Sequence, residues 1–214
     1  MTLPRLYPIL DTASLAARAC PLETAARVLI EGGARILQLR HKGHWPRTLF
    51  EQAERIRNLC GEAGVQFMVN DRADMAVLLD AGLHVGQDDM APQDARRVLG
   101  PGRPLGFSTH NDAQLRAAAA EPADYLALGP IFSTGSKQNP DPVVGVGQLR
   151  RWRPLAARPL VAIGGITRHN ALSVLEAGAD SLAVIGDLLP EPCMAETLRE
   201  RIEEWRQLLT LVRS

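Results

Sequence analysis

Two carboxylates follow two successive short apolar runs, and their placement predicts a cation site. Asp71 comes directly after the run FMVN (67–70), and Asp89 comes shortly after the run LHVG (83–86). If the two runs are neighbouring parallel strands, both carboxylates lie at the same end of the sheet and need a cation to stay ionised together. Hard oxygen ligands with no histidine or cysteine cluster beside them favour Mg²⁺. The sequence therefore predicts Asp71 and Asp89 as magnesium ligands.

A second group of polar side chains lies on an alternating stretch earlier in the chain. In ILQLRHK (36–42), Gln38, Arg40 and Lys42 project to one side of an extended backbone, and the leucines between them project to the other. If the leucines face a layer of helices, the amide and the two cations face the carboxylate site. The alternative is a solvated strand edge, which a strand paired on both sides does not have.

Glycine-containing turns follow the last two apolar runs, as IGGI (163–166) and VIGD (184–187). Glycine lets backbone N–H groups approach an anion closely, so these turns predict a phosphate site, although each alone could be a simple tight turn. The segment STGSK (133–137) adds the hydroxyls of Thr134 and Ser136 and the ammonium group of Lys137, which suit a second anion. Together these groups suit substrates that carry phosphate, with diphosphate as a metal-assisted leaving group.

The elements that must position these residues are eight short apolar runs separated by longer amphipathic segments. Runs of this kind predict parallel strands connected by helices, and eight of them favour a single (β/α)8 TIM barrel over residues 1–214. The alternative is an open doubly wound sheet, but no run is followed by a GxGxxG turn. The eight runs are LYPIL (6–10), ILQLR (36–40), FMVN (67–70), LHVG (83–86), LGFS (105–108), YLALG (125–129), LVAIG (160–164) and SLAVIG (181–186).

Charge and composition restrict the class of protein. Lysine plus arginine equal aspartate plus glutamate at 24 each, so no overall field favours nucleic acid or an anionic membrane as partner. Cys20, Cys60 and Cys193 show no metal-ligand spacing and are expected to be buried or inert. With no signal peptide or apolar span in the sequence, a cytoplasmic protein without a membrane segment is expected. The sequence leaves homo-oligomerisation open.

The five histidines are dispersed and form no ligand pair. His84 lies inside an apolar run and is expected to be structural. His110 lies just past the end of the fifth run, where barrel enzymes place catalytic groups, and it is a candidate acid or base.

At this point the segments resemble those of a known family, the thiamine-phosphate synthases, in order and in spacing. The resemblance extends from about Leu6 to Leu189. It rests on QLRHK (38–42), VNDRADMA (69–76), GLHVGQDD (82–89), GFSTHN (106–111), YLALGPIFSTGSK (125–137) and VAIGGIT (161–167).

The resemblance implies an Mg²⁺-dependent transferase that joins 4-amino-5-hydroxymethyl-2-methylpyrimidine diphosphate to a thiazole phosphate and releases diphosphate. It implies a dissociative reaction in which diphosphate leaves before the thiazole nitrogen attacks. It implies that the catalytic residues are Arg40, Lys42, Ser108 and Lys137. By position it assigns Gln38 to the pyrimidine, Arg40, Lys42, Asn70 and Lys137 to the diphosphate, Asp71 and Asp89 to Mg²⁺, Ser108 to the pyrimidine and leaving group, and Thr134, Ser136, Gly165, Ile185 and Gly186 to the thiazole phosphate.

Two departures from the family pattern are visible. The segment DAGLH (80–84) is one residue shorter than usual, and Gly186 stands where the family usually has serine. The second departure removes one expected hydroxyl contact with the thiazole phosphate.

Three other functions remain as alternatives. A related thiazole tautomerase could use His110 but does not need the carboxylates and diphosphate cations. A noncatalytic barrel that binds a phosphate ligand would lack some of these carboxylates and cations, and the sequence has all of them. A sugar-phosphate epimerase needs an acid–base pair, often with metal-binding histidines, which the histidine spacing does not provide.

Overall fold

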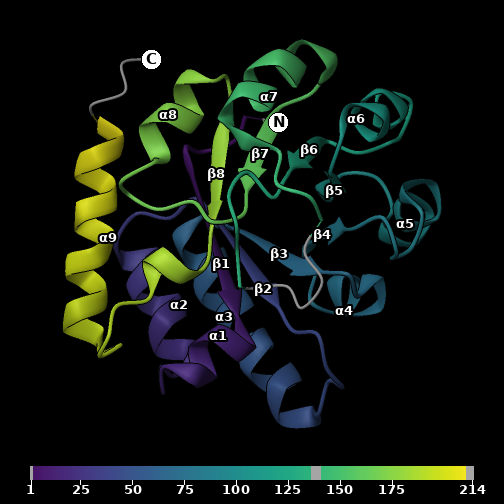
Figure 1. Ribbon diagram of the computed structural model, residues 1–214. Coiled ribbons are helices and arrows are strands. Elements are labelled where there is room, and N and C mark those ends of the chain that lie inside the picture. Colours follow the sequence, from purple (N-terminus) through teal and green to yellow (C-terminus); the bar gives the residue numbers. More distant parts are fainter. Residues whose placement is uncertain (1, 136–140, 211–214) are drawn as a thin grey trace.

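The computed structural model describes residues 2–135 and 141–210, in which eight parallel strands close into a barrel surrounded by helices (Figure 1). The strand order around the barrel follows the chain, and β8 pairs with β1 to close it. This confirms the predicted (β/α)8 fold. The strands are β1 Leu6–Asp11, β2 Ile36–Arg40, β3 Gln66–Asn70, β4 Gly82–Val85, β5 Leu105–Thr109, β6 Tyr125–Leu128, β7 Leu160–Ile163 and β8 Ser181–Val184.

The helices begin and end where local sequence signals place them. Helix α3 stops before Gly64, whose φ of 65° is in the left-handed region that glycine adopts easily. Helix α6 begins after Asn111, whose side chain accepts a hydrogen bond from the backbone N–H of Gln114. The α-helices are α1 Thr12–Ala17, α2 Leu22–Glu31, α3 Arg47–Ala63, α4 Ala73–Leu78, α5 Pro92–Leu99, α6 Asp112–Ala118, α7 Gly145–Trp152, α8 Ala171–Glu176 and α9 Ala195–Thr210; short 3₁₀ turns η1 (Arg153–Leu155) and η2 (Gly186–Leu188) follow α7 and β8.

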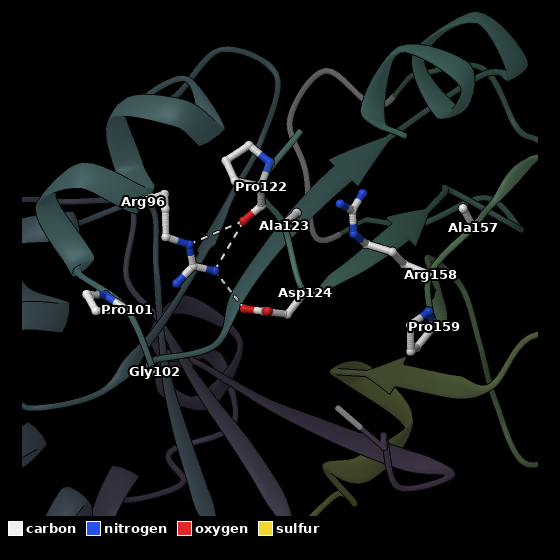
Figure 2. Close-up of a pocket in the computed structure, with 9 residues that line it drawn as sticks. All are labelled: Arg96, Pro101, Gly102, Pro122, Ala123, Asp124, Ala157, Arg158 and Pro159. Atoms are coloured by element: carbon white, nitrogen blue, oxygen red, sulfur yellow. Dashed lines mark hydrogen bonds and ion pairs between the residues drawn. The ribbon is translucent and has the colours of Figure 1, made fainter. Parts of the chain in front are cut away.

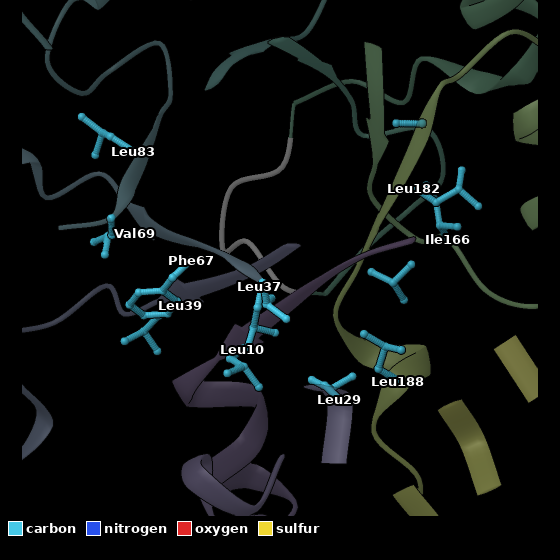
Figure 3. Close-up of a cluster of buried hydrophobic side chains, with 14 of the residues drawn as sticks. Leu10, Leu29, Leu37, Leu39, Phe67, Val69, Leu83, Ile166, Leu182 and Leu188 are labelled. Carbon is cyan, nitrogen blue, oxygen red and sulfur yellow. The ribbon is translucent and has the colours of Figure 1, made fainter. Parts of the chain in front are cut away.

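Two hydrophobic clusters divide the core between the outside and the inside of the barrel. Leu37 and Leu39 belong to the larger cluster between strands and helices, part of which is drawn in Figure 3. Ile36 belongs to the smaller cluster that fills the barrel interior with Tyr7 and Tyr125. Because side chains alternate along a strand, Gln38 must share the interior face with Ile36. The predicted orientation of the leucines toward the helices is thus confirmed.

The N-terminal end of the barrel is tied together by an arginine–aspartate clamp, drawn in Figure 2 beside an open hollow of about 560 Å³. Asp124, just before β6, accepts hydrogen bonds from Arg96 of α5 at 2.7 Å and from the backbone N–H of Leu105 at 2.8 Å. Its own N–H donates to the carbonyl of Leu105 at 2.7 Å. Arg96 also donates to the carbonyl of Pro122. The clamp therefore joins the starts of β5 and β6 to a helix.

A second clamp repeats this arrangement at the starts of β7 and β8. Asp180 accepts hydrogen bonds from Arg153 at 3.0 Å and from the N–H of Leu160 at 2.8 Å, and its N–H donates to the carbonyl of Leu160 at 2.9 Å. Arg153 donates to the carbonyl of Gly178, which occupies the place of Pro122 in the first clamp. Each aspartate thus pairs with an arginine and with the backbone of a strand.

The remaining sequence expectations concern the cysteines and membrane segments. Cys20, Cys60 and Cys193 are buried, and the sulfur atoms of Cys20 and Cys193 lie 2.7 Å apart. Burial raises the pKa of the Cys60 thiol to about 12. No helix among the described residues has the length and apolar character needed to cross a membrane.

Candidate active site

The predicted site residues gather around one pocket of about 630 Å³ at the C-terminal mouth of the barrel. This is the end at which enzymes of this fold place their active sites. Ser136 and Lys137 lie outside the described residues. The predicted residues that line the pocket are Gln38, Arg40, Lys42, Asn70, Asp71, Asp89, Ser108, Thr134, Gly165, Ile185 and Gly186.

The carboxylates of Asp71 and Asp89 share the mouth as predicted. Asp71 has a φ of 64°, a left-handed conformation that is uncommon for a residue with a side chain, and its backbone N–H donates to the carbonyl of His84 at 2.8 Å. Asp89 accepts a hydrogen bond from the N–H of Gly86 at 2.8 Å. Lys42 donates to Asp71 at 2.5 Å. Two strand ends and one strained residue therefore bring these charges together.

The electrostatics of this pair fit a cation. Burial, and then contact with Asp89, raise the pKa of Asp71 to about 6, while Lys42 works in the opposite direction. The pKa of Asp71 is thus raised even though Lys42 contacts it. Within residues 2–135 and 141–210 no third histidine, cysteine or carboxylate joins them. Two hard oxygen donors with open space beside them fit Mg²⁺, which usually keeps several waters.

Arg40 is held by a residue that the sequence did not single out. Its guanidinium forms an ion pair with the buried Asp11, and both side chains are largely shielded from solvent. Asp11 also caps helix α1 by accepting hydrogen bonds from the backbone N–H and the hydroxyl of Ser14 at 2.8 and 2.7 Å. The only signal in the sequence is a carboxylate at the end of the first apolar run.

The loop that carries Lys42 is fixed by His41. One ring nitrogen, Nδ1, lies 2.8 Å from the hydroxyl of Thr12, and Nε2 lies 2.9 Å from the carbonyl of His44. His41 therefore ties the end of β2 to the start of α1. This tie limits the positions that the neighbouring Lys42 can take.

The floor of the pocket contains polar side chains from the barrel interior. His84, expected to be structural, lines the pocket and lies 2.9 Å from the hydroxyl of Ser108. Burial lowers the pKa of His84 to about 4, so the imidazole is neutral at neutral pH. Tyr7 and Tyr125 also line the floor, and burial raises the pKa of both phenols. Sequence reasoning missed both tyrosines, because inward-facing aromatic residues in apolar runs are usually packing residues.

The glycine turn after β7 is shaped by close backbone packing. Gly164 and Gly165 have φ angles of 99° and 62°, and a Cβ atom on Gly165 would lie 2.5 Å from the carbonyl oxygen of Ser133. The N–H of Phe132 donates to the carbonyl of Gly164 at 3.0 Å. Only glycine fits this approach. The segment that carries Thr134 is thereby placed against the turn.

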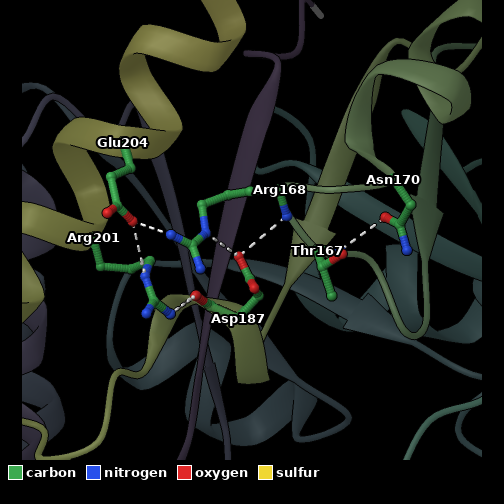
Figure 4. Close-up of polar contacts among 6 residues, drawn as sticks. All are labelled: Thr167, Arg168, Asn170, Asp187, Arg201 and Glu204. Atoms are coloured by element: carbon green, nitrogen blue, oxygen red, sulfur yellow. Dashed lines mark hydrogen bonds and ion pairs between the residues drawn. The ribbon is translucent and has the colours of Figure 1, made fainter.

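The turns after β7 and β8 are joined by a network of charges, shown in Figure 4. Asp187 accepts hydrogen bonds from the backbone N–H and the Nε of Arg168 at 3.2 and 3.0 Å. Arg168 also pairs with Glu204 of α9, and Arg201 donates to the carbonyl of Asp187 at 2.7 Å. We call Arg168, Asp187, Arg201 and Glu204 the clasp. It fixes the backbone beside Gly186 to helix α9.

Gly186 itself is in a different situation from Gly165. Its φ is outside the left-handed region, and a Cβ atom there would meet no atom within 4 Å. The backbone therefore does not require glycine at this position.

His110, the candidate acid or base, is engaged by the protein. Its Nδ1 lies 2.6 Å from the carbonyl of Gly129, and its Nε2 lies 3.5 Å from Asp141. Its backbone N–H donates to Gln114 at 2.7 Å. These contacts connect the end of β5 with the segment after β6.

The fold and the pocket define a (β/α)8-barrel protein with a strongly charged site at the mouth of the barrel. The chain belongs to the thiamine monophosphate synthase family, whose model matches residues 6–188. It is 46% identical to a thiamine-phosphate synthase of Koribacter versatilis over 212 residues, covering 98% of this chain and 97% of the relative. A thiamine-phosphate synthase of Methanoculleus marisnigri is 44% identical and covers 83% of this chain and 86% of its own. The solved structure of a thiamine phosphate pyrophosphorylase from Pyrococcus furiosus aligns with a TM-score of 0.84 at 33% identity, covering 98% of this chain and 97% of that one.

Proposed function

We propose that this protein joins 4-amino-5-hydroxymethyl-2-methylpyrimidine diphosphate to a thiazole phosphate, giving thiamine phosphate and diphosphate. The observation that carries the proposal is the crowding of Asp71 and Asp89 beside Lys42 and Arg40 in one pocket. Crowded carboxylates with two cations close to them suit a bound metal with a diphosphate. Family membership supports the same activity.

In this reaction the carbon–oxygen bond to diphosphate breaks and the electron pair leaves with the diphosphate. The thiazole nitrogen then forms the new carbon–nitrogen bond with the pyrimidine methyl cation. Arg40, Lys42, Asn70 and Lys137 would bind the departing diphosphate and offset its growing charge. Mg²⁺, held by Asp71 and Asp89, would supply further positive charge to that group.

The other residues orient the two substrates. Gln38 and Ser108 would contact the pyrimidine on the pocket floor. Thr134 and Ser136, with the backbone at Gly165, Ile185 and Gly186, would bind the thiazole phosphate. No covalent nucleophile is needed, because positioning and charge stabilisation carry the reaction.

The test is to incubate purified protein with both substrates and Mg²⁺ and to measure thiamine phosphate by mass spectrometry. We expect product only when both substrates and the metal are present, and loss of activity in excess chelator. Isomerisation of a thiazole phosphate without the pyrimidine would instead support a tautomerase. Absence of any turnover, with binding of a phosphate ligand, would support a noncatalytic barrel.

A further inference from the structure

Five side chains on the pocket floor form one continuous chain of hydrogen bonds across the barrel interior. Nε2 of Gln38 donates to the hydroxyl of Tyr7 at 2.9 Å, and that hydroxyl lies 2.8 Å from the hydroxyl of Tyr125. The Tyr125 hydroxyl lies 3.0 Å from Nδ1 of His84, whose Nε2 lies 2.9 Å from the hydroxyl of Ser108. We call these five residues the relay. It joins β2, β1, β6, β4 and β5.

With the Gln38 amide turned so that Nε2 donates to Tyr7, the protons of the relay have one arrangement that satisfies the hydroxyls of both tyrosines. Because Tyr7 accepts from Gln38 and has no other acceptor among the described residues, its proton must go to Tyr125. Tyr125 then donates to Nδ1 of His84, so the neutral imidazole carries its proton on Nε2 and donates to Ser108. The hydroxyl proton of Ser108 is left to point into the pocket.

The structure around the relay accommodates the hydrogen bond between Tyr125 and His84. The rings of His84 and Tyr125 stack with centroids 5.6 Å apart. Gly106 lies against this link, since a Cβ atom there would be 2.1 Å from Cζ of Tyr125 and 2.4 Å from Nδ1 of His84. A residue larger than glycine would displace one of the two partners. The backbone of β5 thus leaves room for this hydrogen bond.

We propose that the relay fixes the hydrogen-bonding polarity of the pyrimidine pocket, an inference that rests on the proposed function. With Nε2 of Gln38 committed to Tyr7, Oε1 of Gln38 is an acceptor, and no described residue donates to it. At the other end Ser108 is a donor. The pocket therefore selects a heterocycle that presents an amino group to Gln38 and an acceptor to Ser108. Tyr7 and Tyr125 are positioning residues that act through Gln38 and Ser108.

This polarity predicts discrimination against the 4-oxo analogue of the pyrimidine diphosphate. Its carbonyl would face Oε1 of Gln38, so two acceptors would meet without a proton between them. Turning the Gln38 amide to avoid this would require every proton of the relay to reverse. A site built for a hydrogen bond rejects a ligand that cannot form it far more strongly than an apolar pocket rejects a changed shape.

The first test reads the His84 tautomer by two-bond ¹H–¹⁵N correlation spectra of substrate-free protein near neutral pH. The His84 signal is assigned by its loss in His84→Gln. We expect a neutral ring protonated on Nε2. A ring protonated on Nδ1 would mean that the relay runs in the opposite direction, and an imidazolium would mean that it is broken; either result overturns the proposal. This readout does not depend on catalysis.

The second test compares Tyr7→Phe with the wild-type protein in kcat/KM for the 4-amino substrate and for the 4-oxo analogue. With its anchor removed, Gln38 can turn its amide, so we expect the preference for the amino substrate to fall by about tenfold or more. The KM for thiazole phosphate should not change. An unchanged preference in a folded variant would overturn the proposal.

Ser181→Ala is the matched control, because it also removes a buried hydroxyl from a strand, and the Ser181 hydroxyl has no hydrogen-bond partner among the described residues. Its substrate preference should equal that of the wild type. If the wild type forms no thiamine phosphate while the predicted tautomer is observed, the proposed function fails and the relay direction stands.

Discussion

At the N-terminal end of the barrel, Asp124 and Asp180 each accept hydrogen bonds from an arginine and from a strand backbone, whereas at the C-terminal end Asp71 pairs with Lys42 and also contacts a second carboxylate, Asp89. Each clamp pairs its carboxylate with an arginine of the same chain. The mouth leaves a carboxyl group whose pKa is raised to about 6. One end therefore uses aspartate for stability, and the other keeps its charges available for a ligand.

The largest expected effect comes from removing charge at the mouth. Asp71→Asn or Asp89→Asn keeps the size of the side chain but removes a hard anionic ligand, so thiamine phosphate formation should fall by about 100-fold or more. Steady-state rates at saturating substrates and Mg²⁺ check this. Asp74→Asn is the matched control, because Asp74 pairs with Arg72 on the surface. Near-normal rates in both site variants would remove the carboxylates from the mechanism.

Asp71→Asn should also stabilise the fold in the absence of metal. Because the folded protein raises the pKa of Asp71 from 3.8 to about 6, it binds this proton more tightly than the unfolded chain does. The contribution of Asp71 to the free energy of unfolding is therefore greatest below the lower value, falls as the pH rises between the two, and stays low above the upper one. Lys42 opposes the rise in the pKa of Asp71, and the value of about 6 already includes its effect.

We expect Asp71→Asn to be more stable than the wild type by about 1–2 kcal/mol above pH 6 in a chelator, and the difference to shrink toward pH 4. Denaturant unfolding at several pH values measures it. A variant that is less stable at every pH would show that Lys42 and the backbone already satisfy Asp71.

At the opposite end, aspartate substitution should affect stability alone. Asp124→Ala and Asp180→Ala each remove an ion pair and a backbone acceptor, and because both side chains are about two-fifths exposed, we expect a loss of only about 1–2 kcal/mol. Thermal unfolding and kcat/KM are measured together. The control is Asp94→Ala, which breaks an exposed pair within one helix. A large loss of activity in a folded clamp variant would mean that the two ends are coupled.

The contrast between the two ends also marks the limit of sequence reasoning. The apolar runs predict the strands because a strand buried on both faces has little freedom of composition, and charged residues at their ends indicate the mouth. Asp71, Asp89 and Lys42 could therefore be located. The Tyr7–Tyr125 contact joins residues 118 positions apart and exists only because the barrel closes. Asp11 and Asp187 were missed for the same reason, since their partners Arg40 and Arg168 lie on other strand ends.

The smallest expected effect concerns Gly186, where the family pattern has serine. The backbone there is outside the left-handed region, and an added Cβ would meet open space, so Gly186→Ser should fold normally. If the turn after β8 binds the thiazole phosphate, the added hydroxyl can donate one hydrogen bond to an anion. Because the new hydrogen bond replaces one between the phosphate and water, its net effect is small. We expect the KM for thiazole phosphate to fall by roughly threefold to tenfold, with kcat little changed. The measurement is the rate against thiazole phosphate concentration at saturating pyrimidine diphosphate.

Gly165→Ser is the contrasting variant, because its side chain would collide with the carbonyl of Ser133 and should impair both folding and activity. An unchanged KM in Gly186→Ser would place the phosphate out of reach of this turn, and the contacts proposed for Ile185 and Gly186 would be wrong.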